Sequence, residues 1–412
     1  MTDSAVPAVM APQSLKVLLI LSVLMAFASI STDVYLPALP VMAGALGASP
    51  GRMELTVSSY LIGFSLGQLL WGPIGDRLGR RGPIAVGLLL FIVGSAGCAL
   101  SDSAASMIAW RVVQAVGGCA SVVLARAMVR DLYAGPQAAR MMSTLMTIMA
   151  IAPLVGPSVG GLILHLGSWR AIFWCLALIA LATLISLKSL PETLHPARRN
   201  RQKFSQALAN YGRLLGHGRL LCYIGSGGFF YAGVYAYVAG TPFAYIDYHH
   251  LAPQYYGLLF ALGIVGIMLT NQLNARLVER LGSDALIRVG ATMTAVAGVS
   301  VVFTAWTGFG GLAGLVVPLL VYVAANGFIV ANSIAGAMSR YPQQAGAVSA
   351  LTGALQYGSG ILGSGLVGLC ADGTPWPMGW VIGVAGLGCL ACALLLGVLA
   401  RRAQPGLELA AG

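Results

Sequence analysis

The stretch Gly-Pro-Ile-Gly-Asp-Arg-Leu-Gly-Arg-Arg at residues 72–81 decides the fold of this chain. It holds one acid and three arginines within ten residues, and long apolar segments flank it on both sides. Charges at this density cannot lie in hydrocarbon, whereas apolar runs of some twenty residues can span a bilayer. The stretch is therefore predicted to be a tight turn at a membrane surface that joins two transmembrane helices.

The composition of the chain indicates an all-α integral membrane protein. Charged residues make up 8% of the 412 residues and hydrophobic residues 58%, whereas soluble domains carry roughly 25% charged residues. The 54 glycines suit close helix packing in lipid. The seven cysteines all fall in apolar segments without the spacing of metal ligands, so we interpret them as small core residues.

Twelve transmembrane spans follow from the apolar segments. Because the number is even, both termini lie on one side of the membrane. When that side is the cytoplasm, all of the 23 Lys and Arg residues except Arg52, Arg111 and Arg170 fall inside or at inner helix ends, so the net charge of +11 reflects topology. The predicted spans cover residues 15–40, 53–73, 82–101, 105–128, 138–164, 168–190, 217–241, 254–276, 284–306, 310–333, 344–370 and 375–400.

The spans divide into two halves. The longest polar stretch begins at Pro191 and predicts a six-helix N-terminal half at 1–195, a cytoplasmic linker at 196–216 and a six-helix C-terminal half at 217–412. The pattern R-L-x-x-R beginning at Arg77 recurs at Arg276, each time after the second span of its half. We interpret the halves as structural repeats with a site between them near the membrane midplane, the second copy having lost its aspartate and glycines.

Twelve spans with this turn after span two resemble the major facilitator superfamily. The turn is similar to that family's G-x-x-x-D-R-x-G-R-R/K signature. The resemblance covers the whole chain and is strongest to the drug–proton antiporters of the bicyclomycin/chloramphenicol-resistance branch. Three segments carry this closer resemblance: 31–40 (STDVYLPALP), 126–133 (RAMVRDLY) and 240–246 (GTPFAYI).

Asp33 is the only acid well inside a predicted span, where an ionisable group costs about 2.5–3.5 kcal/mol on insertion scales. Arg111, in the antiparallel span four, lies at a similar predicted depth. We hypothesise that Asp33 exchanges a proton for substrate, with Arg111 holding the carboxylate charged or releasing it. A static ion pair, or an Asp33 that caps the unwound helix before Pro37, are the alternatives.

Two further patterns resemble signatures of the same family. Arg111, Gln114, Gly117 and Gly118 are similar to R-x-x-Q-G-x-G of span four, which implies a role for Arg111 in proton coupling. In span five, Gly156, Pro157, Gly160 and Gly161 predict a bend with close helix approach. The resemblance of these four to the antiporter signature implies antiport, although an ordinary kinked helix fits the physics equally well.

The turn itself is predicted to be a conformational gate. Asp76 is expected to accept hydrogen bonds at a helix N-terminus, while the arginines reach Asp131, Glu192 or lipid headgroups. The family resemblance implies that the turn latches the two halves on the cytoplasmic side, and simple anchoring of the topology is the alternative. The predicted gate residues are Gly72, Asp76, Arg77, Gly79, Arg80 and Arg81.

Aromatic, methionine and glutamine side chains in the spans are the candidates for contact with substrate, because aromatic rings and flexible methionines suit varied apolar drugs. For each of them, core or lipid-facing packing is the alternative. The candidates for the substrate cavity are Gln114, Met146, Met149, Tyr231, Tyr235, Gln356 and Tyr357.

The sequence carries no enzyme signature, since it has no P-loop, no metal-ligand spacing and no nucleophile elbow. The expected function is therefore proton-coupled efflux of drugs such as bicyclomycin or chloramphenicol by a monomer in the bacterial inner membrane. No metal, cofactor or nucleic acid is expected; protons, drugs and membrane lipids are the partners. Export or import of a metabolite such as an amino acid or sugar is the alternative among transport functions. The alternative from a different functional class is a membrane sensor or scaffold that does not transport.

Overall fold

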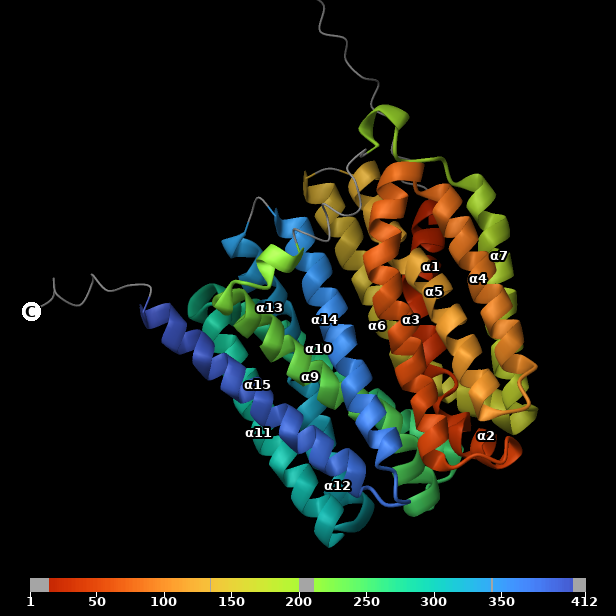
Figure 1. The fold of residues 1–412 in the computed structure, drawn as a ribbon, viewed down its shortest axis with the longest axis vertical. Helices are drawn as coiled ribbons and strands as arrows, with labels where there is room; N and C mark the ends of the chain where they lie inside the picture. Colours follow the sequence, from red (N-terminus) through yellow and green to blue (C-terminus); the bar gives the residue numbers. More distant parts are fainter. Residues whose placement is uncertain (1–14, 134, 200–210, 342–343, 403–412) are drawn as a thin grey trace, which may run out of the picture.

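The computed structural model describes residues 15–133, 135–199, 211–341 and 344–402. This part of the chain is a bundle of long, roughly parallel helices (Figure 1). The predicted all-α membrane fold is confirmed.

The helices fall into a first and a second half of the chain. Those of the first half are α1 (Leu15–Asp33), the 3₁₀ turn η1 (Leu36–Ala38), α2 (Leu39–Ala45), α3 (Pro50–Leu78), α4 (Arg81–Ala99), α5 (Ala104–Leu132), α6 (Gly135–Leu166), α7 (Trp169–Ser186), η2 (Leu187–Ser189) and η3 (Pro196–Arg198). Those of the second half are α9 (Gly218–Pro242), the π-helical turn η4 (Phe243–Tyr248), α10 (Pro253–Leu281), α11 (Ser283–Thr307), α12 (Gly311–Ala324), α13 (Asn326–Arg340), α14 (Ala345–Leu369) and α15 (Trp376–Arg402).

Each predicted span falls on one of these helices, but two spans are interrupted. Span one breaks after Asp33 and resumes as η1 and α2, and span ten breaks at Ala325 between α12 and α13. Eight helical segments of the described residues are long and apolar enough to cross a membrane. Of the other long helices, α6 has an apolar segment at Ile151–Leu166 among its described residues. The helices α3, α9 and α14 pack on other long helices and carry glycine, serine and tyrosine in their sequences.

The helices form two groups, red to yellow and green to blue in Figure 1. Within the first group α5 packs on α3 and α4, and within the second α9 packs on α14 and α15. The groups meet mainly through two helix pairs, α3 with α14 and α6 with α10. The predicted boundary at 196–216 stays a prediction, because residues 200–210 lie outside the described part.

The two ends of the bundle differ in charge. We call the end at which α3, α5 and α13 finish, with Arg77, Arg130 and Arg340, the arginine end. The opposite end holds α2 and η4, and α2 is at the bottom in Figure 1. Since α3, α5 and the broken span formed by α12 and α13 all run toward the arginine end, their last turns place these basic side chains at the same end of the bundle.

The charged turn has a structural counterpart in the second half, but the register of the match differs from the predicted one. Helix α3 ends on Gly79 with φ 99°, and α10 ends on Gly282 with φ 76°. Arg77-Leu78-Gly79 therefore corresponds to Arg280-Leu281-Gly282, one helical turn beyond the predicted match at Arg276. The prediction that the second copy lost its glycines is wrong for Gly79, because a helix end with positive φ favours glycine and Gly282 supplies it. It holds for the other glycines of the turn, since Ala275 and Val278 stand at the positions of Gly72 and Gly75.

Candidate functional site

Asp33 lies at the point where α1 ends. Its side chain is 6% exposed, and its Oδ1 accepts a hydrogen bond of 3.0 Å from the hydroxyl of Thr32. The next turn of chain leads into Pro37, whose ring cannot continue a helix ladder. Among the bonds described, the carboxylate caps no backbone N–H. The structure thus places a buried acid at a helix break in the centre of the bundle.

Arg111 of α5 is fully buried and lies between two aromatic rings. Its guanidinium carbon is 4.2 Å from the ring centre of Tyr35 and 4.3 Å from that of Tyr60. Nη1 donates to the carbonyl of Ser31 at 3.0 Å and to Gln114 at 2.6 Å. Nε and Nη2 have no hydrogen-bond partner in the described structure. A buried guanidinium with free donors can receive an anionic or carbonyl group.

Asp33 and Arg111 meet the same end of α1 without forming an ion pair in the described part of the chain. Arg111 holds the backbone of Ser31, and the Ser31 hydroxyl is hydrogen-bonded to Tyr60 at 2.5 Å. The predicted proximity holds at the level of the helix end, but direct stabilisation of the carboxylate by the guanidinium is not present in this conformation. The static ion pair is absent for the same reason.

Three of the predicted substrate residues come together at the contact between the halves. The ring of Tyr357 on α14 lies 5.7 Å from that of Tyr231 and 6.1 Å from that of Tyr235, both on α9. Phe64 of α3 joins them from the first half, with its ring centre 4.9 Å from that of Tyr357. We call Tyr231, Tyr235, Tyr357 and Phe64 the aromatic cluster. It presents ring faces and phenol groups that suit apolar molecules with a few polar atoms.

Two of the other predicted substrate residues, Gln114 and Gln356, have different contacts. Gln114 is bonded to Arg111 and to Ser95 of α4, inside the first half. Gln356 is 3% exposed and packs against Gly227 of α9, and its amide nitrogen has no partner among the described residues. Met146 and Met149 lie on α6, where their side chains are outside the described residues.

The glycines of α6 contact α1 at Asp33. A Cβ atom on Gly156 would lie 3.2 Å from that of Asp33, and one on Gly160 would overlap the carbonyl oxygen of Val34. Gly161 faces the other half, where a Cβ would lie 3.4 Å from the carbonyl of Pro253 in α10. Pro153 and Pro157 lie inside the same helix. The predicted close approach is thus directed at the candidate proton carrier.

The charged turn is held by carboxylates of its own half. Arg80 is 5% exposed and bonds to Asp76 at 2.6 Å and to Asp131 at 2.8 Å. Glu192 accepts the backbone N–H groups of Arg80 and Arg81 at 2.8 and 3.0 Å. The sequence left Asp131 and Glu192 as alternatives, and the structure uses both.

The hypothesis that Asp76 lies at a helix N-terminus is wrong. Asp76 is in the last turn of α3, and Glu192 fills that role at the start of α4. Burial raises the pKa of Glu192, but the backbone N–H donors of Arg80, Leu194 and Arg81 outweigh it, so the pKa lies below its usual value. Of the other predicted gate residues, Gly79 has a positive φ beside Glu192, Arg81 reaches the carbonyl of Lys188, and Arg77 and Gly72 show no contact of this kind within the described structure.

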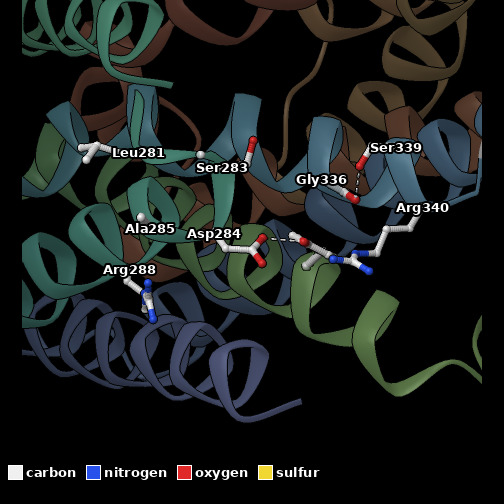
Figure 2. A pocket seen from close by; sticks show the side chains of 10 residues that line it. Leu281, Ser283, Asp284, Ala285, Arg288, Gly336, Ser339 and Arg340 are labelled. Atoms are coloured by element: carbon white, nitrogen blue, oxygen red, sulfur yellow. Dashed lines mark hydrogen bonds between the residues drawn. The ribbon is translucent and has the colours of Figure 1, made fainter. Parts of the chain in front are cut away.

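The second half has a charged pocket at its arginine end, which the sequence reasoning missed. Figure 2 shows Asp284, at the start of α11, between Arg288 and Arg340. Tyr223 donates a hydrogen bond of 2.5 Å to Asp284, and Arg219 is 3.4 Å from the same carboxylate. Asp284 lies at the start of α11, which corresponds to α4 in the first half. Arg81 stands at the equivalent position of α4, so the two halves carry opposite charges there. The corrected register of the repeat would have revealed this.

The fold and the buried charged site define an integral membrane protein of the kind that moves small molecules between two half-bundles. Residues 21–364 match the sequence profile of the Major Facilitator Superfamily, and the chain belongs to that family. It is 34% identical to the uncharacterized MFS-type transporter YdgK of Bacillus subtilis, covering 90% of this chain and 92% of that protein. It is 32% identical to a chloramphenicol resistance protein of Pseudomonas aeruginosa, covering 87% and 85%. The fold is similar to that of the nucleoside transporter NupG, with a TM-score of 0.75, 14% identity and coverage of 93% and 98%.

Proposed function

We propose that this protein exports small, largely apolar antimicrobials, such as chloramphenicol or bicyclomycin, in exchange for protons. The observation that carries the proposal is the buried carboxyl group of Asp33 at a helix break, in contact with α6 and without an ion-pair partner in the described residues. A carboxyl group in such a place can take up and release a proton as its surroundings open and close. The resistance protein among the relatives supports drugs as the substrates.

The proposed cycle begins with proton exchange at Asp33. Protonated Asp33 is neutral and tolerates burial, whereas the ionised form favours the wetted site. A drug that enters the aromatic cluster from the cytoplasm displaces this proton, and Arg111 steadies the end of α1 through the carbonyl of Ser31. Glu192 and Asp131 hold the charged turn during the rocking of the halves.

The proposed setting is the inner membrane of a bacterium, with the arginine end and both termini in the cytoplasm. The concentration of basic side chains at one end of the bundle supports this orientation. The proton gradient is the energy source, and we propose a monomer without a cofactor. A potential of 100 mV supplies about 2.3 kcal/mol per proton, enough to sustain a drug gradient of about fiftyfold.

The test is drug-driven proton release from energised inverted membrane vesicles. Wild-type protein should dissipate a preformed proton gradient when chloramphenicol is added, and Asp33→Asn should not. The matched control is Asp102→Asn, which removes a carboxylate that is 91% exposed at the opposite end of the bundle. Full activity of the Asp33 variant would overturn the role of this residue. A response to amino acids or sugars, with none to drugs, would overturn the substrate class.

A further inference from the structure

A second buried carboxyl group lies at the opposite end from the arginines, between the two halves. Glu54, in the first turns of α3, is 4% exposed and lines a cavity of about 90 Å³. Apart from Pro50 of the same helix, the other walls of this cavity come from the second half, through α9, η4, α14 and the segment that leads into α15. Glu54 was not among the predicted site residues, because it lies only one turn from the start of its helix.

Within the described structure, Glu54 has nothing to balance a negative charge. Its Oε2 is buried without a hydrogen-bond partner among the described residues. No Lys, Arg or His of the described chain lines the cavity, and its other titratable lining groups are Asp247 and Tyr248. Asp372 does not line the cavity but is close enough to act on Glu54 electrostatically, with the same sign of charge. Asp372 already accepts bonds from Thr374. An isolated carboxylate in such a site is strongly disfavoured, whereas the neutral acid is tolerated.

The helix that carries Glu54 touches the second half on both sides of it. One turn before, Gly51 is packed against the carbonyl of Gly368 and against Ala371. One turn after, the hydroxyl of Ser58 is hydrogen-bonded to that of Ser364 at 2.8 Å. Glu54 therefore becomes dry when α3 and α14 close on each other, and separation of these helices is what would let water reach it.

We propose that Glu54 is a second proton-binding group, whose protonation closes the interface between α3 and α14 and whose ionisation favours its opening. The carboxylate takes its proton from outside water when this end is open, and the neutral acid is then buried as the halves meet. A metal ion fits less well, since the described residues hold no group of three His, Cys, Asp or Glu arranged to bind one.

This inference rests on the proposed function. In a drug–proton exchanger, a proton from outside must be bound when the end opposite the arginines closes, because that end faces outward in the proposed orientation. It differs from the role of Asp33 in place and in consequence. Protonation of Asp33 would be coupled to drug binding, whereas protonation of Glu54 would be coupled to closure of the interface between α3 and α14.

The experiment measures the width of this end as a function of pH without any drug. A ketone-bearing amino acid at Leu100 and at Phe309, each 67% exposed at the far ends of α4 and α11, takes a spin label without using the native cysteines. Pulsed electron spin distance measurements are made in lipid nanodiscs between pH 5 and 9. The ratio of open to closed molecules should rise with pH, by at most about tenfold per unit for one proton. In Glu54→Gln and in Glu54→Met, which are neutral and similar in length, the ratio should stay low at every pH.

One control variant and the absence of drug separate this proposal from the proposed function. Glu279→Gln makes the same chemical change at an exposed site on α10 and should keep the wild-type response. Because no drug is present in the measurement, a failure of drug transport leaves this result untouched. The proposal is overturned if Glu54→Gln and Glu54→Met titrate like wild type, or if Na⁺ or Mg²⁺ at constant pH closes this end of the bundle instead of protons.

Discussion

Gly160 of α6 lies directly against the carbonyl oxygen of Val34, the residue after Asp33, so that two helix backbones touch where α1 ends. One turn earlier, Gly156 faces Asp33 itself. Because both α6 positions are glycines, their backbone reaches the candidate proton carrier directly, on the helix that also contacts the other half. The antiporter-like glycines and the acid thus form one packed unit.

Gly160→Ala should abolish coupled transport, because the added methyl group overlaps a backbone atom that cannot move aside without displacing α1. Gly156→Ala, which meets Asp33 at 3.2 Å, should have the milder effect. The control is Gly82→Ala on α4, where no described atom lies within 4 Å of the added one. The measurement is drug-driven proton release, with the melting temperature in detergent as a check on folding. Equal activity of the two α6 variants would contradict the close contact.

Arg111→Lys should reduce transport at least tenfold although the charge is kept. Lysine cannot span the rings of Tyr35 and Tyr60 while bonding both Ser31 and Gln114, and each stacking contact is worth about 0.5–2 kcal/mol. Tyr60→Phe keeps the ring and loses only the hydroxyl bond to Ser31, so it should lose activity only severalfold. Melting temperatures should fall in the same order. Wild-type behaviour of the lysine variant would show that charge alone is needed.

Glu192→Gln should lower the stability of the fold near neutral pH and should reduce the loss of stability as the pH falls. Since the folded-state pKa is lowered, the stabilisation is fully present above the usual value of 4.5 and is lost as pH falls through the folded value. Solvent screening at this exposed position limits the effect to below about 1 kcal/mol. Melting temperatures between pH 3 and 7 test this, with Glu279→Gln as the control. A variant that loses stability with acid as steeply as wild type would contradict it.

Tyr357→Ala should raise the KM for aromatic drugs by about two- to tenfold, because a ring contact contributes about 0.5–1.5 kcal/mol. Tyr357→Phe should stay within about twofold for drugs that do not bond the phenol group. Competition assays with a panel of drugs on an efflux-deficient host measure this. Unchanged competition by every drug in the alanine variant would remove the aromatic cluster from the substrate path.

The helices were predictable from the sequence because lipid requires long apolar segments, and this requirement is local. The contacts between side chains of different helices were not predictable, because they depend on how each helix is rotated about its own axis. Asp33 was found as a charge in an apolar run, but whether it pairs with Arg111 depends on which way each side chain turns. Glu54 escaped notice because its burial comes from the second half, some 300 residues along the chain.

The charged turn shows the same limit. Its residues indicated a membrane-surface turn, but Glu192 was only one of two partners that the sequence allowed. The corrected repeat, Arg77-Leu78-Gly79 with Arg280-Leu281-Gly282, depends on where the helices end, and φ at Gly79 and Gly282 settles this. Pattern matching alone preferred a register one turn away, because two arginines at matching spacing outweigh one glycine.

Helix α6 touches α1 on one face and α10 on another, where Gly257 is packed against Ser158. Both contacts are glycine-mediated and bring the backbones together without a large side chain to compress. A tilt of the second half should therefore displace α6, and the displacement of α6 should move the end of α1, because neither contact contains a side chain that could absorb the movement. Binding of the drug and binding of the proton can therefore be coupled without direct contact between the two, since both depend on the position of α6.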